Sequence, residues 1–123
     1  MAIKRRIDPV LGAAALHEWN STSGGTKAAR SVRATAVRFA LEELATRAEG
    51  NSVEVRVPPF GVTQCIPGPR HTRGTPPNVV EMSDETFLSL VTGKIHWEQA
   101  LGEGTIQASG LRADLSAYLP LFE

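Results

Sequence analysis

The sequence is poor in the residues that hold small domains together through covalent or metal bonds. Its 123 residues include one cysteine, two methionines and three histidines. Cys65 alone cannot form an internal disulfide, and the scattered His17, His71 and His96 give no paired spacing for a zinc ligand set. A chain of this size can bury enough surface to fold without such bonds. We therefore expect a single packed core, with no metal and no cofactor.

An excess of one charge is also missing, because 13 Lys and Arg residues balance 13 Asp and Glu residues. Nucleic-acid binding draws its affinity from clustered cations, so nucleic acid is a poor candidate partner. No apolar run approaches the roughly 18 residues of a membrane span, and no secretory signal pattern opens the chain. The sequence predicts a cytoplasmic protein with no integral membrane association.

The order of apolar and turn-forming residues predicts an α+β domain. Asp8-Pro9 is typical of a helix start, and Asn20 to Gly25 is typical of a flexible connector. Several strands follow one another without intervening helices, which favours an antiparallel-leaning sheet. We predict helices over residues 9–19, 26–50, 83–93, 97–101 and 111–119, and strands over residues 53–57, 60–66, 78–82 and 105–109.

The apolar residues of these elements also predict how they pack. The long helix carries apolar residues on two neighbouring stripes, so it contacts apolar material on two sides, either a sheet and a second helix or a sheet and a ligand. Alternation places Phe60, Val62 and Ile66 on one face of their strand. Leucine recurs at every fourth residue from Leu111 to Leu119, which predicts a final amphipathic helix.

No catalytic set is visible in the sequence. Cys65 lies inside a predicted strand, where a small buried side chain is expected and no base is positioned to activate it. Glu42 and Glu43 occupy adjacent helix positions that point about 100° apart, so they cannot share a substrate and are expected in solvent. Residues 1–7 lack apolar periodicity and predict a loosely held arm. We expect a protein that is not an enzyme.

The second half of the chain resembles the sterol carrier protein family. The resemblance is carried by a strand and an acidic-capped helix over residues 78–94, by a short aromatic-containing helix and a glycine-flanked strand over 97–110, and by the apolar end at 115–119. It covers about residues 27–119 and is similar to the bacterial branch of the family. It implies an α+β fold with a five-stranded, mostly antiparallel sheet covered by helices and an apolar tunnel between sheet and helices.

The same resemblance implies a division of the chain and a function. Residues 1–26 form an N-terminal arm and helix with a flexible connector, and residues 27–123 form the sterol carrier-like domain. The expected function is non-catalytic binding or carriage of a fatty acyl chain, an acyl-CoA or a sterol-like lipid. The tunnel would be lined by Phe39, Leu44, Phe60, Phe87, Leu90, Val91, Trp97, Leu101, Ile106, Leu115 and Leu119.

Two points stay open at this stage. Each tunnel residue is equally expected in a filled core, which leaves the alternative of an accessory or interaction domain. Because the chain is also similar to the C-terminal half of mycothiol-dependent maleylpyruvate isomerases, such a domain would assist a mycothiol-dependent or other partner enzyme. The polar cluster Arg70, His71 and Arg73 would bind the ligand's anionic head group, or would instead brace its own Gly/Pro-rich loop.

Overall fold

The computed structural model describes residues 5–22, 28–68 and 78–122 of the chain. Within these ranges the fold is α+β, as the sequence predicts. The elements are α1 (Pro9–Ser21), α2 (Arg30–Arg47), β1 (Val53–Val57), β2 (Gly61–Cys65), β3 (Val79–Met82), α3 (Asp84–Val91), α4 (Trp97–Gly102), β4 (Ile106–Ser109) and a 3-10 turn, η2 (Ser116–Tyr118).

The strands of the described residues form one four-stranded mixed sheet in the order β2-β1-β3-β4. The β1–β2 and β3–β4 pairs are antiparallel, whereas β1 and β3 are parallel. The parallel pair arises because β3 enters the sheet at the end where β1 begins: the Asn78 side-chain amide donates to the Ser52 carbonyl oxygen at 2.8 Å. The fifth strand that the resemblance implies is not among the described residues.

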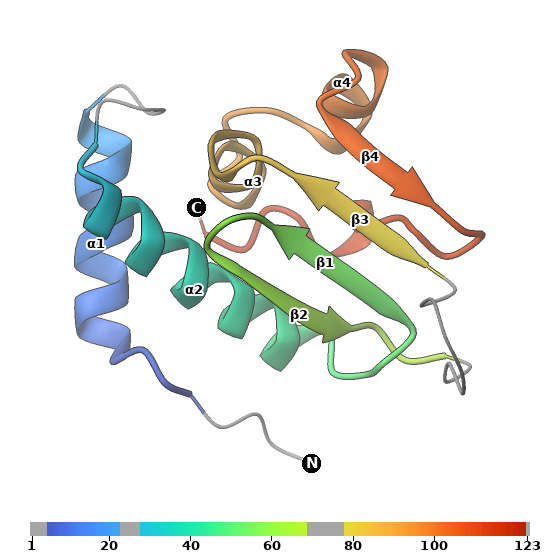
Figure 1. Ribbon diagram of the computed structural model, residues 1–123, viewed down its shortest axis with the longest axis horizontal. Helices are drawn as coiled ribbons and strands as arrows, with labels where there is room; N and C mark the ends of the chain where they lie inside the picture. The colour runs from blue at the N-terminus through green and yellow to red at the C-terminus, as the bar shows by residue number, and fades with distance from the viewer. Residues whose placement is uncertain (1–4, 23–27, 69–77, 123) are drawn as a thin grey trace.

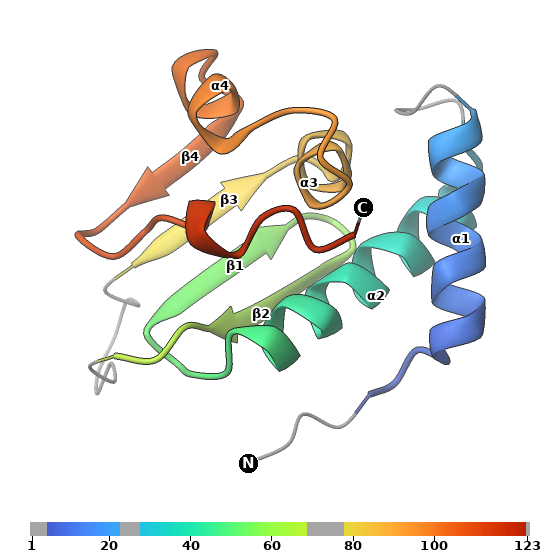
Figure 2. The same cartoon turned by 180° about the vertical axis from the view of Figure 1, so that it is seen from behind.

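One face of the sheet carries the helices. Figure 2 shows α2, α3 and the C-terminal segment, residues 110–122, lying across this face, with α1 packed on the outer side of α2 and α4 near β4. The opposite face, turned to the viewer in Figure 1, has no described helix over it. The long helix α2 therefore has apolar neighbours on two sides, the sheet and α1, which confirms the first of the two arrangements expected for its two stripes.

Helices α1 and α2 cross at a close contact. A Cβ atom on Gly12 would lie 2.3 Å from Cγ of Phe39, so glycine is required where α1 meets this ring. On the same helix Leu16 and Trp19 are buried in the common core. The contact fixes α1 against the flank of α2 instead of on the sheet.

The predicted face of β2 is wrong by one residue. Phe60 belongs to the preceding turn, where its N–H donates to the Val57 carbonyl oxygen at 2.9 Å. The register then pairs Gly61 with Val57 and Cys65 with Val53 on the helix side of the sheet. Since successive side chains alternate between faces, Val62 points to the open face and is 59% exposed. The alternation was present in the sequence, but the turn decided its phase.

The predicted final helix is also wrong, because only η2 forms in residues 111–119. The Asn78 side-chain oxygen accepts the Arg112 N–H at 2.9 Å, and the Asp114 carboxylate accepts the Ser116 N–H at 2.8 Å. In a helix the Ser116 N–H would bond the Arg112 carbonyl oxygen, so the Asp114 side chain competes with the helix for this donor, and Pro120 favours extended backbone at the residue before it. As a result Leu115 is fully buried while Leu111 is fully exposed.

The start of the chain is bound more firmly than the sequence predicts. The Glu42 carboxylate accepts the backbone N–H groups of Arg6 and Ile7, at 2.9 and 3.1 Å. Glu43 pairs with Arg5 at 2.7 Å and with Arg47 at 2.6 Å. The two adjacent glutamates thus hold residues 5–7 against α2, which corrects the expectation that both side chains lie free in solvent.

Candidate functional site

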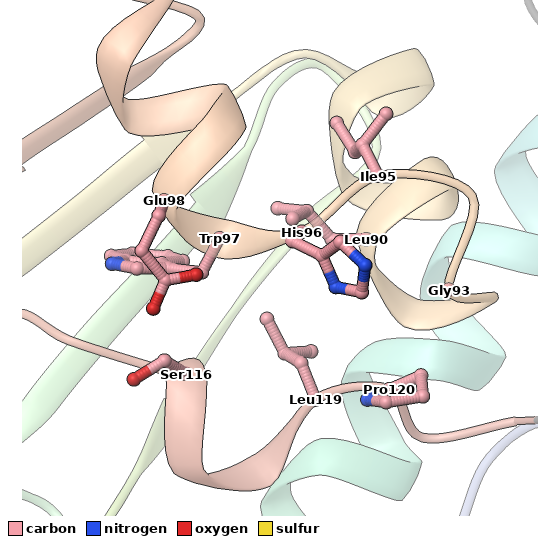
Figure 3. A pocket seen from close by; sticks show the side chains of 9 residues that line it. All are labelled: Leu90, Gly93, Ile95, His96, Trp97, Glu98, Ser116, Leu119 and Pro120. Carbon is pink, nitrogen blue, oxygen red and sulfur yellow. The ribbon is translucent and has the colours of Figure 1, made fainter.

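A small cavity lies where the end of α3, the start of α4 and the C-terminal segment meet. Its volume is about 90 Å³. Figure 3 shows Leu90, Trp97 and Leu119 forming its apolar wall, while His96, Glu98 and Ser116 bring polar groups to its rim. The remaining lining residues are Gly93, Ile95 and Pro120.

The polar rim of this cavity does not form a catalytic relay. Within the described ranges no hydrogen bond joins the side chains of His96, Glu98 and Ser116, although nucleophilic catalysis needs a serine within hydrogen-bond reach of its base. Ser116 instead uses its backbone N–H to bond Asp114. The cavity is also much smaller than the roughly 300–1,000 Å³ of typical small-molecule sites. It has room for a small apolar group and not for a long acyl chain.

A larger and mostly apolar groove runs between α1, α2 and the last residues of the chain. Its volume is about 400 Å³, within the range of small-molecule sites. Phe39 and Phe122 form an aromatic wall, with ring centroids 5.5 Å apart and an interplanar angle of 22°. The other lining residues are Ala13, Leu16, His17 and Asn20 from α1 and Thr92 after α3.

The small cavity and the groove are separated by two bonded segments, residues 91–93 after α3 and residues 120–122 near the end of the chain. The N–H groups of Leu121 and Phe122 both donate to the Val91 carbonyl oxygen, at 3.0 and 2.9 Å. Gly93 and Pro120 face the small cavity, and Thr92 and Phe122 face the groove. The C-terminal segment therefore separates the small cavity from the groove.

A third hollow, of about 540 Å³, lies on the open face of the sheet. Arg56 stands in it, paired with Glu54 at 2.5 Å and with Glu81 at 3.9 Å. Pro58, Pro59, Gly61 and Val62 complete its lining. Because three charged side chains occupy it, this hollow suits an apolar ligand less well than the groove does.

The structure separates the predicted tunnel residues into four groups. Leu90, Trp97 and Leu119 line the small cavity, and Phe39 lines the groove. Leu101 is 46% exposed on the outer side of α4 and lines none of the three hollows. The rest are buried in the core: Leu44, Phe60, Phe87, Val91, Ile106 and Leu115.

The predicted polar head-group residues Arg70, His71 and Arg73 lie outside the described residues. Within the described ranges no group of three or more His, Cys, Asp or Glu side chains is placed to hold a metal ion. No described helix is long and apolar enough to cross a membrane. Burial raises the pKa of the Cys65 thiol to about 12, so the thiol stays protonated and is a poor nucleophile at neutral pH.

Sequence reasoning missed most of the groove. Ala13, Leu16, His17 and Asn20 follow helical spacing along α1, so one face of that helix was readable from the sequence. Phe122, in contrast, reaches the groove only because the C-terminal segment crosses the helix face of the sheet. No local pattern in the sequence specifies that path.

A model of one known protein family matches most of the chain. The family model described as bacterial SCP ortholog matches residues 29–121, which include every described strand and all helices except α1. No curated protein matches the chain. The match confirms the resemblance to the bacterial branch of the sterol carrier protein family.

Proposed function

The chain belongs to the bacterial SCP ortholog family, and we propose that it is a non-catalytic domain that binds or carries an apolar ligand of the fatty acyl, acyl-CoA or sterol-like class. One observation carries the proposal: the groove of about 400 Å³ is open, largely apolar and walled by two stacked aromatic rings. Burying apolar ligand surface there supplies binding free energy of about 25 cal/mol per Å² before the costs of association.

The groove supports this function in its polar groups as well. His17, Asn20 and Thr92 are the polar side chains of its lining, against the apolar Leu16 and Phe39. A few placed polar groups in an apolar pocket fix the orientation of a ligand. In this proposal the apolar body of the ligand lies against Phe39, and its polar end lies beside the α1 side chains.

The predicted tunnel residues retain a place in the proposal. Leu90, Trp97 and Leu119 form a second apolar surface, which the segments that contain Thr92 and Phe122 separate from the groove. A long ligand would reach this surface only if the C-terminal segment moved. Arg70, His71 and Arg73 remain the predicted partners of an anionic head group.

A second candidate function is favoured by the filling of the interior. The small cavity between α3, α4 and the C-terminal segment holds only about 90 Å³, and Phe87, Leu88 and Leu115 are almost completely buried. A domain with such a core would serve as an accessory or interaction domain for a partner enzyme. Native mass spectrometry of the purified protein separates the two functions: a co-purifying lipid mass supports the carrier, and bare protein under conditions that retain lipids supports the accessory domain.

Filling the groove tests the carrier function at the site itself. Ala13 lines the groove, whereas the next residue, Ala14, is also exposed but does not line it. Ala13→Trp should abolish binding of a fluorescent fatty acid, because the indole takes the space of the ligand. Ala14→Trp adds the same group to the same helix and should leave binding of the fluorescent fatty acid unchanged. If both variants bind like the original protein, the groove is not the ligand site.

A further inference from the structure

Three arginines of α2 gather around a single residue at the β1–β2 turn. The guanidinium carbons of Arg30 and Arg33 lie 5.1 and 5.7 Å from the centroid of the Phe60 ring. Arg38 donates its Nε–H to the Phe60 carbonyl oxygen at 2.9 Å. The helix and the turn thus bring three positive charges to one place, and none of the three residues lines the groove or the small cavity.

The described part of the chain balances the charge of only one of these three arginines. Arg33 pairs with Asp84 at 3.1 Å. Neither Arg30 nor Arg38 forms an ion pair with any described carboxylate. Because like charges repel, an anion held among these side chains would lower the free energy of the cluster.

The arginines are also held in place before any ligand arrives. The Phe60 ring, 5% exposed, gives Arg30 and Arg33 an aromatic surface to stack on. Arg33 is fixed further by its bond to the Ala28 carbonyl oxygen at 3.3 Å. Arg38 is anchored through Nε alone, so its two terminal nitrogens keep their donors for another acceptor. Side chains ordered in advance lose less conformational entropy on binding.

We propose that Arg30, Arg33 and Arg38 form a binding site for a phosphate group at the β1–β2 turn. The planar guanidinium offers pairs of N–H donors that match phosphate oxygens, which a single-point ammonium does not. The phosphate belongs either to a small soluble molecule or to a lipid head group. This site is separate from the groove and does not depend on the proposed carrier function.

Titration with inorganic phosphate, followed by NMR of the Phe60 and Gly61 amides and the arginine Nε–H signals, tests the site. We expect saturable shifts. The affinity for phosphate that they report should fall about tenfold in Arg30→Gln and in Arg38→Gln, since each variant loses a charged hydrogen bond. Arg47→Gln removes the same charge from the far end of α2 and should leave the titration unchanged. Arg30→Lys keeps the positive charge but lacks the paired N–H donors of the guanidinium, so it should bind phosphate more weakly than the original protein.

Two outcomes would overturn the proposal: shifts that never saturate, or equal weakening in Arg47→Gln, either of which indicates general ionic attraction. Arg30, Arg38 and Arg47 are all exposed, and a melting curve of each variant confirms that it is folded. A second arm adds vesicles of phosphatidylcholine with or without phosphatidic acid. Competition only by phosphatidic acid assigns the phosphate to a lipid head group, and no competition assigns it to a soluble molecule.

Discussion

The interior beneath the sheet and the flank between α1 and α2 are built from similar apolar residues, yet only one of them is filled. Beneath the sheet, Leu115 and Leu121 of the C-terminal segment are buried in the same core as α3. At the flank, Gly12 brings α1 against Phe39 at one point, while small side chains such as Ala13 leave the adjacent groove open. Whether a chain keeps room for a ligand depends on where its own segments lie, and less on how apolar its residues are.

The largest expected effect tests the filled side of this comparison. Phe87 is 1% exposed, so Phe87→Ala should lower the free energy of unfolding by about 3–5 kcal/mol through lost burial and the cavity left behind. Leu101→Ala, at a half-exposed position, should cost less than about 1 kcal/mol. Urea unfolding measures both. A mild Phe87→Ala would show that the interior is loosely packed.

A smaller effect is expected at the contact that places α1. In Gly12→Ala the new Cβ would overlap the Phe39 ring, and the forced shift should cost about 1–3 kcal/mol. Gly102→Ala is the matched control, because nothing lies within 4 Å of its added Cβ. The control should be neutral or slightly stabilising. Equal stability of the two variants would mean that α1 does not pack on α2 at this point.

The bound start of the chain predicts a modest dependence on pH. Burial raises the pKa of Glu43, but the hydrogen bonds and charges of Arg5 and Arg47 outweigh it, and the net pKa is lowered from 4.5. Because the pKa of Glu43 is lower in the folded than in the unfolded protein, its ion pairs with Arg5 and Arg47 stabilise the protein fully at pH values above the unfolded pKa. This contribution is lost as the pH falls through the folded pKa.

Glu43→Gln should therefore reduce stability by about 0.5–1 kcal/mol at neutral pH and by less in acid. Melting temperatures measured from neutral to acidic pH check this, with Glu18→Gln on the exposed side of α1 as the comparison. A constant difference across the pH range would contradict the ion-pair account.

The smallest effect concerns reactivity at the edge of the filled core. With its pKa raised to about 12, the Cys65 thiol should resist a disulfide reagent in the native protein and react readily in urea. The native rate then reports local opening of β2. Rapid reaction at neutral pH without denaturant would show that this end of the sheet is not closed.

Much of the architecture was predictable because local chemistry fixes it. Asp8 caps α1 by accepting the Val10 N–H at 2.9 Å, and Ser83 caps α3 by accepting the Thr86 N–H at 3.2 Å. The alternation of Val53, Val55 and Val57 gave a strand whose buried face is that of the sequence pattern. These signals act within a few residues, so they survive whatever the rest of the chain does.

The sequence by itself therefore determined the α+β class, the starts of α1, α3 and α4, β1 and the family of the chain. Only the tertiary structure decided the phase of β2, the path of the C-terminal segment and the separation of the predicted tunnel residues. The reason is physical: Asn78 bonds both the Ser52 carbonyl oxygen and the Arg112 N–H, contacts that span 26 and 34 residues. Such long-range bonds redirect a backbone whose local pattern favours a helix.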